Sequence, residues 1–377
     1  MKVLFSRKAL ILYAGLAFGV LAALLVRWGN PANMGFCSLC FLRYIAGGLK
    51  LHSTATVQYL RPEIMGLVLG ATGAALIFRE FRPRSGGAPL VRFVLGFFIA
   101  IGALIFLGCP WRMLLRLCGG DLSALFGVAG LLVGVTAGII FLRRGFNLGR
   151  AVKTYAAAGW IMPVIFAVLL IFVICNASFL SSSATGPGSL HPAIWISLLA
   201  GLFIGFVAQR VRFCTMGGWR DLIMVKDTYL FLGLIGLFVG TLVANYCLGF
   251  FGDGGVATST GTISYHWGFT KQPIALPGVD GVGNIRWTDF LMDAGGMALV
   301  GLAAVLAGGC PLRQLVMSGE GDGDAGVTVV GMIVGGAVAM SFGFASNGTG
   351  PGALGPWALV AGLVVCLIIG FTMRERA

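Results

Sequence analysis

Gly108-Cys109-Pro110-Trp111-Arg112 recurs as Gly309-Cys310-Pro311-Leu312-Arg313, and each copy ends a long apolar run. At this constant offset of 201 residues, seven of fourteen positions are identical as far as Asp121 and Asp322. Cysteine and proline are seldom matched together by chance, so we interpret the chain as a duplication. Each half then brings one cysteine and one arginine to a break between apolar helices.

The composition around these strings is that of a membrane protein. The 377 residues are 58% hydrophobic and 10% charged, with a mean hydropathy of +0.95. A soluble core of this length cannot hide so much apolar surface, and repeated apolar runs of about 20 residues are typical of spanning helices. The 60 glycines fit helices that pack closely in lipid. The sequence therefore predicts an all-α polytopic membrane protein.

Ten spans are predicted, in two groups of five, which we assign to an N-terminal repeat (1–180) and a C-terminal repeat (181–377). An odd number of spans per repeat inverts the second repeat relative to the first, as in many transporters. Four shorter segments that carry cysteines are predicted to be re-entrant or broken helices, with Cys37 and Cys109 approaching from outside and Cys214 and Cys310 from inside. The spans are 9–27, 62–79, 91–108, 122–142, 156–175, 190–209, 229–250, 289–308, 325–345 and 354–373, and the short segments are 33–50, 109–120, 213–226 and 310–320.

Loop charges predict the orientation of the chain. Most predicted inner loops are rich in Lys and Arg, whereas the outer loops 176–189 and 346–353 contain neither. This asymmetry places both termini in the cytoplasm. The formal charge of +13 is then explained by topology and by anionic membrane lipid, so nucleic acid is not expected as a partner. Residues 251–288 form an outer loop insertion, either an ordinary one or a lid over the path.

A second duplication concerns the other two cysteine segments. Phe36-Cys37-Ser38-Leu39 aligns with Phe213-Cys214-Thr215-Met216, and Arg43 and Arg220 follow six residues after the cysteine. A thiol is a weak hydrogen-bond donor and acceptor that an apolar constriction tolerates. Proline directly after Cys109 and Cys310 predicts that these cysteines are N-caps, with free backbone N–H groups aimed at an anion. The four cysteines therefore mark a substrate path, by hydrogen bonding or by covalent attack.

The arginines leave alternatives open. Arg112 and Arg313 either attract an anion or pair with Asp121 and Asp322 in their own segments. Arg43 and Arg220 either attract an anion or reach to the membrane interface. Cys40 and Cys118 are secondary candidates, because glycines stand at the matching places of the other half; Cys175, Cys247 and Cys366 are interpreted as packing residues. The three scattered histidines predict no metal site, and the absence of a phosphate-binding motif argues against an ATP-driven pump, so no cofactor is expected.

At these doubled segments the chain resembles the YeeE/YedE sulfur-transport family, and Cys37-Ser38-Leu39-Cys40-Phe41-Leu42-Arg43 is similar to its subgroup associated with selenium metabolism. The resemblance implies a bacterial inner-membrane protein, not an enzyme, that moves thiosulfate or a related anion inward along pore cysteines. Those cysteines map onto Cys37, Cys109 and Cys310, and Cys214 lies at the symmetric fourth position. The additional Cys40 and Cys118 make a selenium species a competing cargo.

Three classes of function follow from the sequence. The first is a transporter or channel for a small inorganic sulfur or selenium anion, which would deliver its cargo to a cytosolic sulfur- or selenium-carrier protein. The second is a membrane thiol-disulfide oxidoreductase, because Cys37 and Cys40 have the CxxC spacing of redox proteins. The third is a membrane docking component of selenium metabolism that transports nothing.

Overall fold

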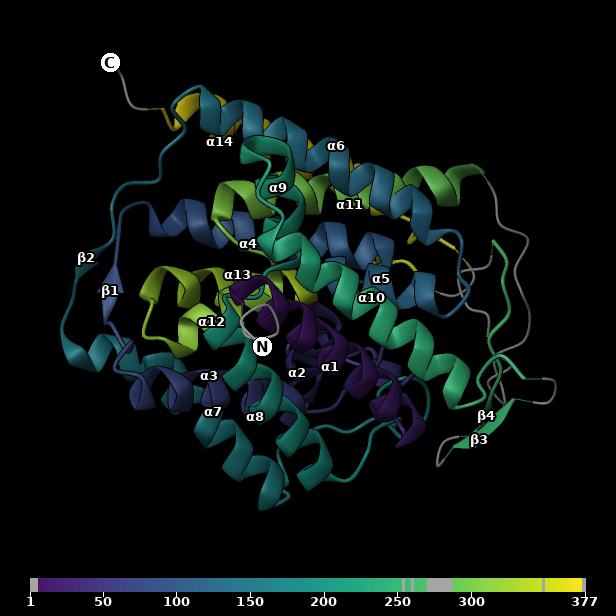
Figure 1. Ribbon diagram of the computed structural model, residues 1–377. Coiled ribbons are helices and arrows are strands. Elements are labelled where there is room, and N and C mark those ends of the chain that lie inside the picture. The colour runs from purple at the N-terminus through teal and green to yellow at the C-terminus, as the bar shows by residue number, and fades with distance from the viewer. Residues whose placement is uncertain (1–5, 253–254, 259–260, 270–286, 348–349, 375–377) are drawn as a thin grey trace.

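The fold is built from ten long and four short helices in the part of the chain that a computed structural model describes, residues 6–252, 255–258, 261–269, 287–347 and 350–374 (Figure 1). Ten helical segments there are long and apolar enough to cross a membrane, as predicted. The long helices are α1 (Arg7–Arg27), α3 (Pro62–Ile77), α4 (Pro89–Phe106), α6 (Ala124–Arg143), α7 (Ala156–Ile174), α8 (Ile194–Val211), α10 (Tyr229–Cys247), α11 (Trp287–Ala307), α13 (Gly323–Ser341) and α14 (Gly355–Thr372). The all-α polytopic class is confirmed.

The short helices coincide with the four cysteine segments that the sequence singled out. They are α2 (Ser38–Gly48), α5 (Pro110–Cys118), α9 (Thr215–Val225) and α12 (Pro311–Gly319). Two small antiparallel strand pairs were not predicted. The first joins β1 (Arg84–Ser85) to β2 (Val152–Lys153), and the second joins β3 (Val256–Thr258) to β4 (Gly261–Ile263). Both lie in loops, where they tie together segments between helices.

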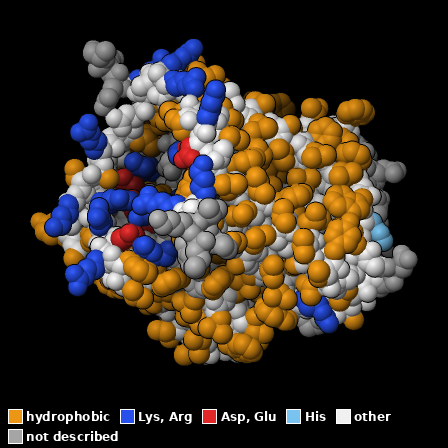
Figure 2. Space-filling model, viewed as in Figure 1, with side chains coloured by type: hydrophobic (Ala, Val, Ile, Leu, Met, Phe, Trp, Pro, Cys, Tyr) orange, Lys and Arg blue, Asp and Glu red, His pale blue; other side chains and the backbone are white. Residues whose placement is uncertain are grey.

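Contacts between loops define two opposite ends of the molecule. At the end that we call the N-terminal face, Lys8 donates a hydrogen bond to Thr228 at the start of α10. At the other end, which we call the hairpin face, Arg27 bonds the Ala257 carbonyl in β3. Lys and Arg side chains gather near the edge that carries β1 and β2, and hydrophobic side chains cover the broad middle of the surface (Figure 2). This distribution matches a membrane protein with one strongly basic end.

Helices of the first half pack mainly on helices of the second half. The main pairs are α1 with α10, α3 with α8, α4 with α13, α6 with α11, and α4 with α11. At the α4–α11 crossing, Gly102 faces Gly296, and a β-carbon on either would collide with the backbone carbonyl of the other. Small residues allow such close approach of helices in lipid. The two halves are therefore interleaved and share one core.

Two helix breaks explain why the doubled Gly-Cys-Pro segments form short helices. α4 ends at Leu107, with a φ of 65°, and α11 ends before Gly308, with a φ of 87°. Left-handed residues end helices, and glycine adopts this conformation without the steric penalty that leucine incurs. Pro110 and Pro311 then begin the next helix at its first position, where the missing N–H is no loss. The path of the chain here is set by local sequence.

A buried ion pair fixes α5 in place. Arg116, whose side chain is 1% exposed, donates from Nε to Asp121 Oδ2 at 2.7 Å. Its remaining N–H groups bond the Phe106 carbonyl at the end of α4 and, at 2.8 Å, Ser123 Oγ before α6. The Asp293 carboxylate of α11 lies 3.5 Å from the same guanidinium. Arg116 thus joins three helices to the end of α5.

Arg116→Met is expected to destabilise the protein strongly, because it leaves the Asp121 carboxylate buried without its cation. Breaking a buried ion pair by removing one partner costs about 3–5 kcal/mol. The measurement is the melting temperature of the detergent-solubilised protein. Arg143→Met, which removes an exposed arginine at the end of α6, is the control and should leave it nearly unchanged. Equal melting temperatures for the two variants would contradict this structural role.

Candidate functional site

Four cysteines occupy the N-cap positions of the four short helices. Cys37 caps α2, Cys109 caps α5, Cys214 caps α9 and Cys310 caps α12. All four are buried. The N-cap positions of Cys109 and Cys310 were predicted from the following prolines and are confirmed. Those of Cys37 and Cys214 were not deduced, because no proline follows them and only their doubled Phe-Cys-Ser/Thr string marks them.

The short helices point their N-termini into the protein from both ends. α5 ends at the hairpin face, where Gly268 donates a hydrogen bond to the Gly120 carbonyl at 2.9 Å. α12 ends at the N-terminal face, where Arg82 donates to the Glu320 carbonyl at 3.0 Å. The first turn of a helix has unsatisfied N–H groups and the positive end of the helix dipole. Buried helix starts of this kind favour an anion.

The cysteines meet in two groups, one from each half of the chain. The sulfur atoms of Cys37 and Cys109 are 3.6 Å apart. The thiols of Cys214 and Cys310 also contact each other, and we call them the N-terminal-side pair. All nine cysteines of the chain carry free thiols. Cys37 and Cys109 are 72 positions apart in the sequence, and Cys214 and Cys310 are 96 positions apart. The helix breaks bring the two cysteines of each pair together.

Cys40 and Arg112 complete the first group. The Cys40 thiol contacts Cys37, and Arg112 Nη1 donates to Cys40 Sγ at 3.3 Å. We call Cys37, Cys40, Cys109 and Arg112 the hairpin-side cluster. The predicted alternative of an Arg112–Asp121 pair is wrong, because Asp121 is bonded to Arg116 one helical turn further on. Within the described ranges, no carboxylate forms an ion pair with Arg112.

Arg313, the equivalent of Arg112, has a different environment. Its Nη1 lies 3.0 Å from Glu320 Oε1 in an ion pair. The predicted alternative partner, Asp322, instead accepts from Arg84 at 2.7 Å, so that expectation is also wrong. The first half has Gly119 where the second has Glu320, which explains why only Arg313 finds a carboxylate. The duplicated arginines are thus not electrostatically equivalent.

The second pair of arginines shows the same contrast. Arg43 is buried inside the helix bundle, with its guanidinium 4.9 Å from the Tyr44 ring centroid and Nη1 3.9 Å from Met340 Sδ. This position excludes the interfacial role that the sequence allowed for Arg43. Arg220 is partly exposed and pairs with Asp221 at 2.8 Å. The two first-half arginines are therefore buried cations without a carboxylate among the described residues, and both second-half arginines are paired.

Further acidic groups compensate charge at the N-terminal face. Gln209 donates to Glu80 at 2.7 Å, and Arg212 bridges Glu80 and Glu320, at 3.1 Å and 3.2 Å. The hydrogen bond from Gln209, together with Arg210 and Arg212, lowers the pKa of Glu80. Glu80 therefore stays ionised at neutral pH, and these arginines remain paired.

Three buried hydrogen-bond donors lie near the hairpin-side cluster, and they were not identified from the sequence as donors without a partner. Ser38 Oγ, Trp111 Nε1 and Arg43 Nε have no hydrogen-bond partner among the described residues. Ser38 follows Cys37 directly, and Trp111 is the second residue after Cys109. A buried donor without a partner is costly, so such groups usually serve a ligand or water. The signals in the sequence were the doubled Ser/Thr position and the Trp-to-Leu difference between the copies.

The described part of the predicted outer loop reaches this cluster through Tyr265. Its hydroxyl accepts the backbone N–H of Asn33 at 3.1 Å, and the Asn33 carbonyl accepts from Arg112 Nε at 3.1 Å. Burial raises the pKa of Tyr265, so it stays a neutral phenol. Residues 253–254, 259–260 and 270–286, which belong to the loop predicted as a lid or an ordinary insertion, lie outside the described residues.

Tyr265→Phe is expected to weaken the hold on Arg112 without unfolding the protein. Asn33 has a φ of 52°, and the loss of one hydrogen bond at this conformation costs about 1 kcal/mol. The expected result is a severalfold loss of anion binding by the detergent-solubilised protein, measured by calorimetry. Tyr246→Phe, which changes a tyrosine hydroxyl that contacts Trp267 at the same face, is the control. Equal loss in both variants would contradict a specific link to Arg112.

Cys118 lies away from both thiol groups. It ends α5, about 13 Å along the helix from Cys109, and its thiol donates to the Phe238 carbonyl of α10 at 3.2 Å. This contact joins α5 to α10. Of the two secondary candidates, Cys118 therefore contributes to helix packing, whereas Cys40 belongs to the hairpin-side cluster.

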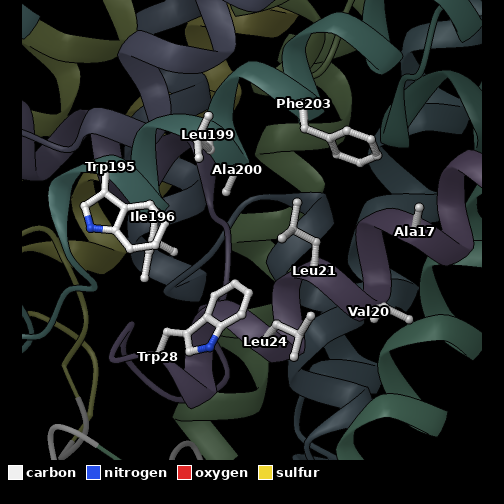
Figure 3. Close-up of a pocket in the computed structure, with 10 residues that line it drawn as sticks. All are labelled: Ala17, Val20, Leu21, Leu24, Trp28, Trp195, Ile196, Leu199, Ala200 and Phe203. Carbon is white, nitrogen blue, oxygen red and sulfur yellow. The ribbon is translucent and has the colours of Figure 1, made fainter.

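An apolar groove lies on the outside of the bundle between α1 and α8 (Figure 3). It has a volume of about 660 Å³ and is bordered by Trp28 and Trp195, whose indoles lie near the hairpin-face ends of the two helices. Tryptophan is enriched at membrane interfaces. The groove carries no charged side chain or cysteine, so it matches lipid hydrocarbon and is separate from the thiol groups.

Two known proteins are similar to about a third of this chain. No family model matches the chain. The thiosulfate transporter TsuA of Escherichia coli strain K12 is 31% identical over 124 residues, 33% of this chain and 28% of that protein. The thiosulfate transporter TsuA of Spirochaeta thermophila is 34% identical over 128 residues, 34% of this chain and 31% of that protein. The two matches agree with the resemblance that the doubled cysteine segments indicated. The matched region covers less than a third of the length of each relative.

Proposed function

We propose that the chain is a membrane transporter or channel for a small sulfur-containing anion, which passes the buried cysteines near the midplane. The observation that carries the proposal is the hairpin-side cluster. Two N-capping thiols, Cys37 and Cys109, lie 3.6 Å apart beside the cation Arg112. An uncompensated arginine inside a membrane protein normally faces a cavity, a partner or a substrate. The names of the two similar transporters favour thiosulfate as the cargo.

Thiols suit the passage of such an anion. A cargo must bind well enough to enter an apolar constriction and weakly enough to leave. Thiols offer weak S–H donors and polarisable sulfur. The backbone N–H groups at the starts of α5 and α12 add donors that require no charge to be buried. The cargo is therefore proposed to move between the two thiol groups by hydrogen bonding.

The unequal arginines give this path a direction of decreasing anion affinity. Arg112 and Arg43 leave the hairpin side electropositive, whereas Glu320 and Asp221 neutralise Arg313 and Arg220 on the other side. An anion is thus held more tightly at the hairpin-side cluster than at the N-terminal-side pair. We assign capture to the hairpin face and release to the N-terminal face.

Membrane placement and symmetry belong to the same proposal. The basic edge at β1 and β2 (Figure 2) belongs to the N-terminal face, because the Arg84 N–H bonds the Gly321 carbonyl just after α12. This charge favours a cytoplasmic position for both termini in a bacterial inner membrane. The exchange-symmetric helix pairs, such as α1 with α10 and α3 with α8, support two inverted repeats. Transport is then inward. A cytosolic carrier protein for the delivered sulfur or selenium is the corresponding partner.

The burial of the thiols argues against the oxidoreductase alternative. Cys37 and Cys40 are both 0% exposed, and a redox cysteine must reach a partner thiol or disulfide at a partly exposed site. Besides Cys40, Cys37 contacts Cys109, whose sulfur lies 3.6 Å away and is outside the CxxC spacing. The structure therefore favours cargo contact over disulfide exchange.

Uptake by purified protein in liposomes tests the proposal. Liposomes that contain the protein should accumulate radiolabelled thiosulfate above the level of empty liposomes. Parallel assays with selenite and sulfite separate a sulfur cargo from a selenium cargo. Absence of flux for all three anions would refute transport and leave a docking role. A Cys37–Cys40 disulfide that cycles during turnover, trapped by alkylation, would reverse the ranking in favour of the oxidoreductase.

A further inference from the structure

Trp111 joins the cysteine segments of the two halves. Its ring centroid lies 5.9 Å from that of Phe36 and 5.5 Å from that of Phe213. These phenylalanines directly precede Cys37 and Cys214. Phe18 of α1 closes the group at 5.4 Å from Trp111. The Trp111 indole therefore packs between Phe36, next to the hairpin-side cluster, and Phe213, next to the N-terminal-side pair.

The indole N–H of Trp111 makes no hydrogen bond within the part of the protein that the structure describes. Trp111 is fully buried, and its Nε1–H has no hydrogen-bond partner there. Buried indole N–H groups usually find an acceptor, because leaving one unpaired is costly. Only one residue, Pro110, separates it from the N-cap Cys109, at the positive end of α5. The residue that carries this donor therefore belongs to the first turn of α5, where an anion is favoured.

The duplication makes Trp111 exceptional. Its counterpart in the second copy is Leu312, at the same position after the cysteine and proline. Leu312 is equally buried but has no polar atom in its side chain. Only the first half thus supplies an aromatic ring and an N–H donor at the junction of the two halves.

We infer that Trp111 is the selectivity residue of the path. The inference rests on the proposed transport function and specifies the class of cargo. The ring packs against Phe36 and Phe213 and fills the junction between the two thiol groups, so its loss opens a passage for small ions such as chloride. The Nε1–H is donated to an oxygen of the passing anion and adds one hydrogen bond to the binding of an oxyanion such as thiosulfate. No bond is made or broken in this step.

Two substitutions test the aromatic ring and the N–H donor of Trp111 separately. Trp111→Phe retains an aromatic ring without the N–H, and Trp111→Leu introduces the residue that the second copy has. For Trp111→Phe we expect an about tenfold rise in the KM for thiosulfate uptake and in the Kd measured by calorimetry, since a hydrogen bond to a charged group contributes that order. For Trp111→Leu we expect the chloride leak of proteoliposomes to rise about tenfold. Trp219→Phe is the matched control, because its indole also lacks a partner among the described residues but packs on Phe231.

The readouts distinguish this inference from the proposed function. If the wild type binds thiosulfate but does not transport it, transport is refuted, and the Kd comparison still tests the donor. Equal Kd values for Trp111→Phe and wild type, or an unchanged chloride leak in Trp111→Leu, would overturn the role of Trp111. Absence of thiosulfate binding by the wild type would overturn it as well. Monodisperse elution and a wild-type melting temperature for Trp111→Phe establish that the variant is folded.

Discussion

Thiosulfate uptake by the double variant Cys109→Ala, Cys310→Ala should fall to the level of empty liposomes. Each cysteine caps a broken helix and touches the other thiol of its group. Alanine cannot donate a hydrogen bond, so the cargo loses a contact at both steps of the path. If each thiol contributes a hydrogen bond to a charged group, the combined loss is about 100-fold or more. The measurement is the initial rate of uptake of radiolabelled thiosulfate in proteoliposomes.

Cys366→Ala supplies the matched control for this prediction. Cys366 lies in α14 and is 0% exposed, like Cys310, but it is in neither thiol group. The control should lose some melting temperature, because a small buried side chain is truncated, and should retain uptake. Cys109→Ser adds a second comparison, since a hydroxyl can still donate. Normal uptake by the double alanine variant would remove the cysteines from the path.

Arg112→Gln is expected to raise the KM for uptake about tenfold or more, whereas Arg313→Gln should change it less than about threefold. The reason is that Arg112 has no carboxylate partner within the described ranges, and Arg313 is neutralised by Glu320 at 3.0 Å. The Arg112 guanidinium contacts the thiol cluster directly through Cys40. Loss of Arg313 instead leaves Glu320 still paired with Arg212 at 3.2 Å, so the charge near the thiols changes less. The measurement is uptake against thiosulfate concentration at fixed ionic strength.

Two further variants make this contrast decisive. Arg112→Lys keeps the charge but not the fork of donors that bonds Asn33 and Cys40, so its KM should lie between those of the wild type and Arg112→Gln. Glu320→Gln should lower the KM, because it releases the charge of Arg313. Equal effects of Arg112→Gln and Arg313→Gln would contradict the asymmetry and the direction assigned to the path.

Much of the fold followed from local features of the sequence. The predicted span 91–108 corresponds to α4 (Pro89–Phe106), and the predicted short segment 310–320 corresponds to α12 (Pro311–Gly319). Apolar length determines where a helix can cross a membrane. The N-caps Cys109 and Cys310 were also predictable, because a proline after a cysteine specifies the first helical residue.

The arginine partners were not predictable in this way. Pairing with Asp121 was one of two alternatives for Arg112, the other being attraction of an anion, but Asp121 pairs with Arg116 one turn later. Arg116 itself was overlooked, since nothing in the sequence distinguishes a buried arginine from a basic residue at a loop. Which guanidinium meets which carboxylate depends on how α5 is rotated against α4 and α6, and hydropathy does not specify this rotation.

By itself the sequence determined the ten long apolar helices and the four short helices that follow a cysteine, because hydropathy, proline and left-handed glycine act over a few residues. Only the tertiary structure decided that Cys37 meets Cys109, that Cys40 holds Arg112 and that Trp111 bridges Phe36 and Phe213. These contacts join residues on different helices, so they depend on interhelical distances and rotations. The duplicated Gly-Cys-Pro strings are alike in sequence, and their unequal charge arises from the neighbours that packing places beside them.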